Sequence, residues 1–340
     1  MATAAAGAMS AFWTGRRVLV SGATGIVGSW LCAELLRRGA SVVALVLDDD
    51  PQSWFYRSGA AESCAIVNGD LTRIEDCTRA INVHDAQTVF HLGAQTIVGA
   101  AQRDPLGCFE ANVRGTYNLL EAARRLAPLV TSFVVASSDK AYGESEVLPY
   151  TEEMPLRGAH PYDVSKSCAD LLAGAYFHSY GLPVTIARCG NIYGGGDLNW
   201  SRIVPGTIRS LLVGERPVLR SDGGPIRDYI YVEDVVSAYL ALAEAAERPE
   251  VRGEAFNFAP QRPLTVRAIV DAIAEVMGVA ADPIVLDTAV NEIRAQVLDA
   301  SKAARLLEWS PAWPLERGLR ETVAWYRAFL GVPDGAKAQR

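Results

Sequence analysis

The fold is decided by residues 18–31, V-L-V-S-G-A-T-G-I-V-G-S-W-L, where an apolar strand runs into an amphipathic helix through three glycines. Gly22, Gly25 and Gly28 have the spacing G-x-x-G-x-x-G. Glycine lets the backbone turn sharply and approach a pyrophosphate, whose charge is met by amides at the helix N-terminus. The alternative is an ordinary tight turn, but a long run of strand-helix units follows. We therefore expect a dinucleotide to contact Gly22, Thr24, Gly25, Ile26 and Gly28.

Apolar strands and helical stretches alternate from Arg16 onward. The expected strands are residues 18–20, 41–47, 64–67, 88–92, 133–137 and 184–188. Continuous apolar strands that alternate with helices are typical of a parallel sheet covered on both faces. The pattern predicts an α/β protein with a Rossmann-like, doubly wound parallel sheet.

The alternation loosens after about residue 190, where Gly and Pro cluster in residues 190–197 and 220–225. We interpret this change as the start of a smaller, partly interleaved substrate lobe. The expected division is a loose N-terminal tail (1–15), an NAD-binding domain (16–189 plus about 228–258), the lobe (190–227 and 259–332) and a C-terminal tail (333–340).

Composition narrows the class of protein. Half of the 340 residues are hydrophobic, so the chain can bury a large core, and the net charge of −7 without a basic run argues against nucleic-acid or anionic-membrane partners. The six cysteines form no C-x-x-C pair, which favours reduced thiols and the cytoplasm. The first ten residues lack the pattern of an export signal, and no segment has the apolar length of a membrane span.

Polar residues at strand ends indicate which dinucleotide is bound. Asp48 follows the second strand, where an acid commonly binds a ribose 2′-hydroxyl, although a solvated acidic loop is an equal alternative. No Arg or Lys occupies residues 48–50 to receive a 2′-phosphate, so NAD is favoured over NADP. Asp70 is a candidate adenine contact or a helix cap, and His91 is expected to be a core residue. Further expected cofactor contacts are Leu71, Leu92, Gly93, Ala94 and Gln95.

A reactive group of side chains is predicted from two motifs, S-S-D-K-A-Y-G (137–143) and P-Y-D-V-S-K (161–166). Tyr162 and Lys166 are four residues apart, so a helix presents both on one face. A phenol has a pKa near 10 and becomes a base at neutral pH only when cations favour its phenolate. An ammonium one turn away and an oxidised nicotinamide supply that bias, while Ser138 can bond the same substrate oxygen. Each motif alone is common, but together they predict a proton and hydride relay.

Several motifs together resemble the extended short-chain dehydrogenases/reductases, in the branch of nucleotide-sugar epimerases and dehydratases. They are the glycine turn, H-L-G-A-Q-T, E-A-N-V-R-G-T-Y-N-L-L-E-A, the two reactive motifs, A-R-C-G-N-I-Y-G, R-D-Y-I-Y-V-E-D-V and L-E-W-S-P. The resemblance extends from about residue 12 to residue 330.

The resemblance implies roles for individual residues. Tyr162 would be the general base, Lys166 would lower its pKa and hold the nicotinamide ribose, and Ser138 would assist the sugar hydroxyl. Asn112 would contact the cofactor, and Gln95 the cofactor and the substrate. The substrate phosphates would be bound by Asn191, Arg227 and Arg294; for the two arginines, surface salt bridges are the alternative. Helices near residues 105–126 and 161–180 would form a homodimer; no metal is expected.

Asp139 and Lys140 bear on the reaction that follows oxidation at C4 of the sugar. An Asp-Lys pair at this position resembles that of CDP-glucose 4,6-dehydratases, which need an extra acid and base. Residues 227–235 instead resemble the epimerase form. A charged Lys140, with Arg202, could attract a uronate carboxylate. The sequence-based hypothesis is an NAD-dependent 4-epimerase of UDP-glucuronate or a related UDP-hexose, in an antibiotic or cell-surface glycan pathway. The alternatives are a CDP-glucose-type 4,6-dehydratase and a non-catalytic NAD-binding sensor.

Overall fold

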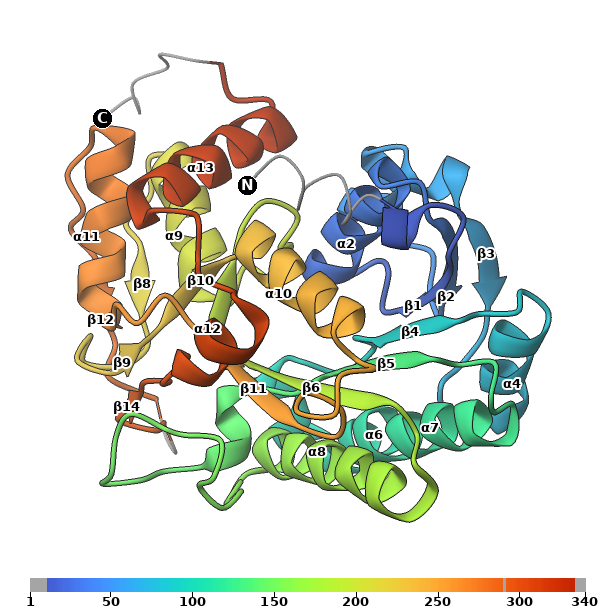
Figure 1. Ribbon diagram of the computed structural model, residues 1–340. Coiled ribbons are helices and arrows are strands. Elements are labelled where there is room, and N and C mark those ends of the chain that lie inside the picture. The colour runs from blue at the N-terminus through green and yellow to red at the C-terminus, as the bar shows by residue number, and fades with distance from the viewer. Residues whose placement is uncertain (1–10, 290–291, 334–340) are drawn as a thin grey trace.

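A seven-stranded parallel sheet forms the centre of the structure, a computed structural model that describes residues 11–289 and 292–333 (Figure 1). Its order across the sheet is β11 (Ala255–Phe258), β6 (Val184–Cys189), β5 (Ser132–Ala136), β4 (Thr88–His91), β1 (Arg17–Ser21), β2 (Ser41–Val46) and β3 (Ala65–Asn68). All neighbouring strands are parallel, and the order reverses direction between β1 and β4. This is the doubly wound topology, so the predicted fold class is confirmed.

Alternation along each strand divides the core into two layers. Val18 and Val20 of β1 pack in the layer covered by α2 (Ile26–Arg37) and α10 (Val232–Glu244). Leu19 points to the opposite layer, which is covered by α4 (Ile74–Asn82), α7 (Gly115–Arg125) and α8 (Pro161–Tyr180). Figure 1 shows these two groups of helices on opposite faces of the sheet. Shorter elements on this part of the chain are α3 (Trp54–Arg57), η1 (Ala60–Ser63), α5 (Val98–Arg103), α6 (Pro105–Phe109), the π-helical η2 (Glu110–Arg114) and η3 (Asp139–Tyr142).

The smaller lobe is built from short strands and three helices, at the left of Figure 1. Its strands are β7 (Asn191–Tyr193) paired with β10 (Tyr229–Tyr231), β12 (Leu264–Thr265) with β9 (Ile226–Arg227) and β14 (Ala295–Gln296), and β13 (Ile284–Val285) with β8 (Val218–Leu219). Its helices are α9 (Ile203–Leu212), α11 (Val266–Met277) and α13 (Leu315–Leu330), which share a separate apolar core.

The chain crosses between the sheet and the lobe more than once. After β10 it returns to the sheet as α10 and β11, and α12 (Ser301–Leu307) later packs against β11. Aromatic side chains also join the two parts: the Trp54 ring lies 6.0 Å from that of Trp30 on α2 and 5.8 Å from that of Trp325 on α13. The lobe is therefore held against the sheet by both backbone and side chains.

The expected N-terminal tail is partly wrong. Residues 1–10 lie outside the described residues, but Trp13 is fully buried and donates a hydrogen bond to Glu244 on α10. The large indole gains more from burial than from exposure, so the packed chain begins before the first strand. Within the described residues, no helix combines the length and apolar composition that a membrane span needs.

Candidate active site

A cavity of about 1600 Å³ opens at the carboxyl ends of the central strands and extends between the sheet and the lobe. Open α/β sheets bind ligands at this edge, where the strand order reverses. Single-ligand pockets usually measure about 300–1000 Å³, so this cavity has room for two ligands side by side. Both predicted groups of residues, the glycine turn and the reactive motifs, line its wall.

The glycine turn is packed so closely that only glycine fits. A Cβ added at Gly28 would lie 2.1 Å from the Gly22 carbonyl oxygen, and one added at Gly22 would lie 2.7 Å from the Gly93 nitrogen. Gly25 is the N-cap of α2, and no side chain caps the helix amides there. These amides and the helix dipole suit a pyrophosphate, so the turn fits a dinucleotide cofactor.

The other expected cofactor residues, in the glycine turn and at the ends of the second, third and fourth strands, also line the cavity; they are Thr24, Ile26, Asp48, Asp70, Leu71, Leu92, Gly93, Ala94 and Gln95. Asp70 has a structural task as well, because its Oδ1 accepts a hydrogen bond from the Thr72 amide at 2.8 Å. The wall beyond β2 carries Asp48 and Asp50, in a segment of sequence without Arg or Lys. This wall suits a free ribose hydroxyl better than a 2′-phosphate.

Two expected residues lie behind the cavity wall. Asn112 is buried, and its carboxamide accepts from the Gln95 nitrogen at 2.7 Å and donates to the Gln95 oxygen at 3.0 Å. Asn112 therefore does not line the cavity and acts through the backbone of Gln95. The expectation that His91 is a core residue is confirmed: it is buried, its ring nitrogens lie 2.9 Å from the hydroxyls of Ser21 and Thr116, and burial lowers its pKa to about 3.

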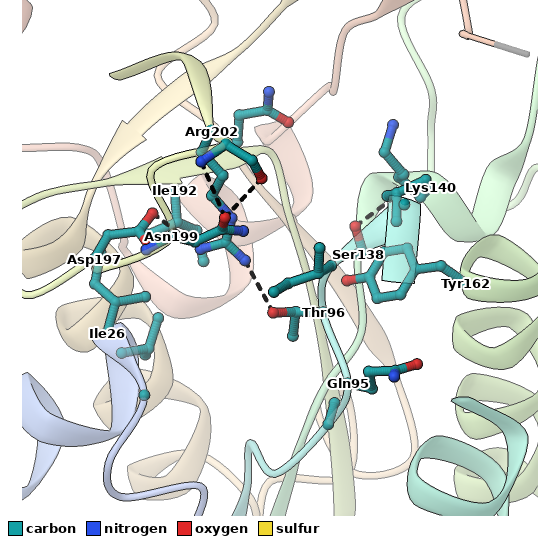
Figure 2. A pocket seen from close by; sticks show the side chains of 18 of the residues that line it. Ile26, Gln95, Thr96, Ser138, Lys140, Tyr162, Ile192, Asp197, Asn199 and Arg202 are labelled. Carbon is teal, nitrogen blue, oxygen red and sulfur yellow. Dashed lines mark hydrogen bonds and ion pairs between the residues drawn. The ribbon is translucent and has the colours of Figure 1, made fainter. Parts of the chain in front are cut away.

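Tyr162 and Lys166 occupy the first two turns of α8, which starts with Pro161 at its first position. The Lys166 ammonium nitrogen donates to the Ala136 carbonyl at 2.9 Å and lies 5.9 Å from the centre of the Tyr162 ring. Figure 2 shows the Tyr162 hydroxyl pointing toward Ser138. Burial lowers the pKa of Lys166 to about 8 and raises the pKa of Tyr162, against which the charge of Arg202 acts. Tyr162 thus needs further positive charge in the cavity before it can act as a base.

Asp139 and Lys140 lie on the same wall, at the start of η3. The Ser138 hydroxyl donates to Asp139 Oδ1 at 3.0 Å, and Lys140 Nζ donates to Gln296 Oε1 at 2.6 Å. Burial raises the pKa of Asp139, with Lys140 acting in the opposite direction, and burial lowers the pKa of Lys140, with Asp139 opposing. Both groups are therefore biased toward their neutral forms.

The expected substrate residues divide into two sets. Asn191, Arg202 and Arg227 line the cavity, whereas Arg294 lies outside it and pairs with Asp222 at 3.1 Å, with 72% of its side chain exposed. The surface position of Arg294 corresponds to the salt-bridge alternative.

Both cavity arginines already have carboxylate partners. Arg227 is buried and pairs with Glu292 at 3.1 Å, while Arg202 pairs with the buried Asp197 at 3.0 Å and donates to Thr96 (Figure 2). Sequence analysis missed these acids and several other polar residues on the wall: Asp163, Asp197, Asn199, Arg220 and Glu292. Asp163 stands inside the motif P-Y-D-V-S-K, directly after Tyr162, so its position in the sequence was a usable signal.

Residues 18–259 match the model of the NAD dependent epimerase/dehydratase family. The chain belongs to this family. The expected family resemblance and the expected cofactor, NAD, are thereby confirmed. The match covers the glycine turn, the reactive motifs and the return of the chain to the sheet, so it includes most of the cavity wall.

Similar proteins include both 4,6-dehydratases and 4-epimerases. The CDP-glucose 4,6-dehydratase of Salmonella typhimurium is 31% identical over 338 residues, covering 95% of this chain and 94% of the relative. A crystal structure of the UDP-glucose 4-epimerase of Thermotoga maritima with UDP-glucose is 29% identical, with a TM-score of 0.84 and coverage of 92% of this chain and 99% of that chain. MoeE5 in complex with UDP-glucose and NAD is 28% identical, with a TM-score of 0.82 and the same coverage. The chain is an NAD-dependent enzyme of the nucleotide-sugar epimerase/dehydratase type.

Proposed function

We propose that this protein is a nucleotide-sugar 4,6-dehydratase that acts on a nucleoside-diphosphate glucose, with CDP-glucose as the first substrate to test. The observation that carries the proposal is the Asp139–Lys140 pair on the cavity wall, directly after Ser138, with Asp139 buried and Lys140 partly buried. An epimerase has no use for an additional acid and base at this point. The similarity to a CDP-glucose 4,6-dehydratase supports the same choice.

The first step is oxidation at C4 of the sugar. Bound NAD supplies the hydride acceptor and the positive charge of its nicotinamide. Tyr162 takes the proton of the 4-hydroxyl, Ser138 holds the same oxygen by a hydrogen bond, and Lys166 keeps positive charge beside the phenol. The cavity arginine Arg227 would bind the diphosphate, for which its planar guanidinium is suited.

The second step is the elimination of water. A 4-keto group acidifies the proton at C5, and Lys140 accepts that proton only if its amine is neutral. Asp139 gives its proton to the 6-hydroxyl, so that the C6–O bond breaks and water leaves. C6 then takes back the hydride, and C5 takes a proton from Lys140 that has exchanged with solvent. Burial lowers the pKa of Lys140 and raises that of Asp139, which are the two directions that this division of roles requires.

A 4-epimerase, including one for UDP-glucuronate, is the second candidate. It is favoured by one observation: residues 227–235, R-D-Y-I-Y-V-E-D-V, resemble the epimerase form of this segment. We rank it second because a 4-epimerase leaves the additional acid and base, Asp139 and Lys140, without a role.

The test is incubation with CDP-glucose, other nucleoside-diphosphate glucoses and UDP-glucuronate in deuterated water. A dehydratase gives a 4-keto-6-deoxy sugar with deuterium at C5. An epimer at C4 without label at C5 would overturn the proposal in favour of the second candidate. Tyr162→Phe should abolish both outcomes, whereas Tyr180→Phe, an exposed tyrosine on the same helix, should have no effect. Bound NAD without turnover in any of these assays would instead favour the non-catalytic sensor.

The expected cytoplasmic location and homodimer stay predictions. The six cysteines are unpaired, which suits a reducing compartment. Leu171 and Tyr180 on α8 are 64% and 61% exposed, on one of the two helices expected to form the dimer contact. Exposed apolar side chains of this size are common at interfaces.

A further inference from the structure

The partner of Lys140 comes from a distant part of the chain. Gln296 lies on β14, 156 residues after Lys140, and it is fully buried. Its Oε1 accepts from Lys140 Nζ at 2.6 Å, while its Nε2 has no hydrogen-bond partner in the described part of the chain. Burying an unpaired amide N–H lowers stability. Filling space therefore does not by itself account for Gln296, whose carboxamide oxygen serves as the acceptor for the Lys140 amine.

Four charged groups influence the pKa of Lys140. Asp139 precedes it on η3, Asp163 belongs to α8, and Glu292 and Arg227 belong to the lobe. The three carboxylates favour the ammonium and Arg227 opposes it, but burial outweighs them all and lowers the pKa of Lys140. In this setting the neutral carboxamide of Gln296 supplies an acceptor without adding a fourth negative charge.

The strand that carries Gln296 also pairs with the strand of Arg227, the residue expected to bind the substrate diphosphate. Gln296 on β14 is opposite Arg227 on β9 in a parallel pair. The residue that holds the Lys140 amine is thus fixed to the strand that carries the Arg227 guanidinium. Arg227 and Lys140 both line the cavity, so a substrate bound by Arg227 occupies the cavity that Lys140 lines.

We propose that Gln296 is a positioning residue, whose carboxamide oxygen orients the Lys140 amine as a neutral base for the C5 proton. The inference rests on the proposed dehydratase function and names the residue on which its elimination step depends. A carboxamide accepts one N–H and leaves the nitrogen lone pair free, whereas a carboxylate at the same place would favour the ammonium and remove the lone pair.

The decisive variant is Gln296→Glu, which is nearly isosteric. An opposite charge at hydrogen-bond distance raises a lysine pKa by roughly 1–3 units. The acidic limb of the kcat profile for dehydration should move to higher pH by the same amount, and C5 deuterium incorporation at pH 7 should fall about tenfold or more. Formation of reduced nicotinamide on mixing with substrate, which reports oxidation at C4, should stay within about twofold. Gln52→Glu adds the same charge at an exposed position outside the cavity and should match the wild type.

Gln296→Met, which removes the acceptor without adding charge, provides a second measurement if the Glu variant does not fold. It should reduce C5 incorporation without an alkaline shift, and C4 oxidation should again persist. An unshifted pH profile for Gln296→Glu, or equal losses of C4 oxidation and C5 incorporation in either variant, would overturn the role of Gln296. These failures are distinct from a failure of the proposed function, in which the wild-type enzyme itself incorporates no deuterium at C5.

Discussion

Breaking the ion pair between Arg188 on β6 and Asp170 on α8 is expected to destabilise the active-site helix strongly. Arg188 Nε and Nη2 each donate to one Asp170 oxygen at 2.8 Å, and both side chains are almost fully buried. Arg188 Nη1 also donates to the Tyr142 hydroxyl at 2.8 Å, on the segment η3 that carries Lys140. Arg188→Met should therefore disturb both the fold and the reactive wall.

The size of the stability loss depends on the Asp170 charge that the substitution leaves buried and unpaired. Removing one member of a buried pair strands the other charge, which lowers the free energy of unfolding by about 3–5 kcal/mol. An unfolding entropy of about 2.1 cal/mol/K per residue converts 1 kcal/mol into roughly 1.4 °C for a chain of this length. The melting temperature of Arg188→Met should therefore fall by about 4–7 °C.

Urea denaturation and a thermal scan measure the effect. The matched control is Arg125→Met, which breaks an exposed pair with Glu121 and should cost no more than about 1 kcal/mol. Arg188→Met combined with Asp170→Leu should recover most of the loss, because an apolar pair leaves no stranded charge. A loss below about 1 kcal/mol for Arg188→Met, or no recovery in the double variant, would refute the assignment of the effect to a buried charge.

Two further predictions concern the cofactor end and pH. Gly28→Ala should weaken NAD binding about tenfold or more in titration calorimetry, because its Cβ would lie 2.1 Å from the Gly22 oxygen. Gly174→Ala, at a position inside α8 with open space around it, should instead stabilise the fold by about 0.5–1 kcal/mol. An NAD affinity of Gly28→Ala equal to that of Gly174→Ala would contradict this prediction. Lys166 has a folded pKa of about 8, below its unfolded value of about 10.4, so the unfolded state binds more protons between these values. The wild-type stability should therefore rise from pH 8 to pH 10 relative to Lys166→Met in urea titrations, and parallel curves would show that burial does not depress this pKa.

Local sequence was sufficient for the residues whose roles depend on one turn or one helix. Gly22 and Gly28 contact each other within a single strand-helix turn, and Tyr162 and Lys166 share one helix face. For these pairs, the number of residues between them in the sequence determines how close they lie in the structure. The parallel sheet could likewise be predicted, because each of its central strands is a continuous apolar run.

Residues brought together by the lobe could not be predicted in this way. Gln296 and Glu292 reach the cavity region through strands of two residues and irregular segments, which are too short to show any periodicity. Asn112 lies in the π-helical η2, whose hydrogen bonding departs from the usual helical period. A family motif identifies such a residue but does not say whether it faces the ligand or the backbone behind the wall.

α10 and β11 come late in the sequence but complete the sheet and its cover, which limits how the chain can be divided into fragments. A fragment that ends at Cys189 would leave the edge of β6 unpaired and uncover the apolar layer that α10 seals. A nascent chain must be synthesised as far as Phe258 before the sheet can close, by which time residues 190–227 have already been made. An exchange of sugar specificity between relatives by gene recombination would accordingly need several crossover points, since one junction cannot separate the two ligand-binding halves.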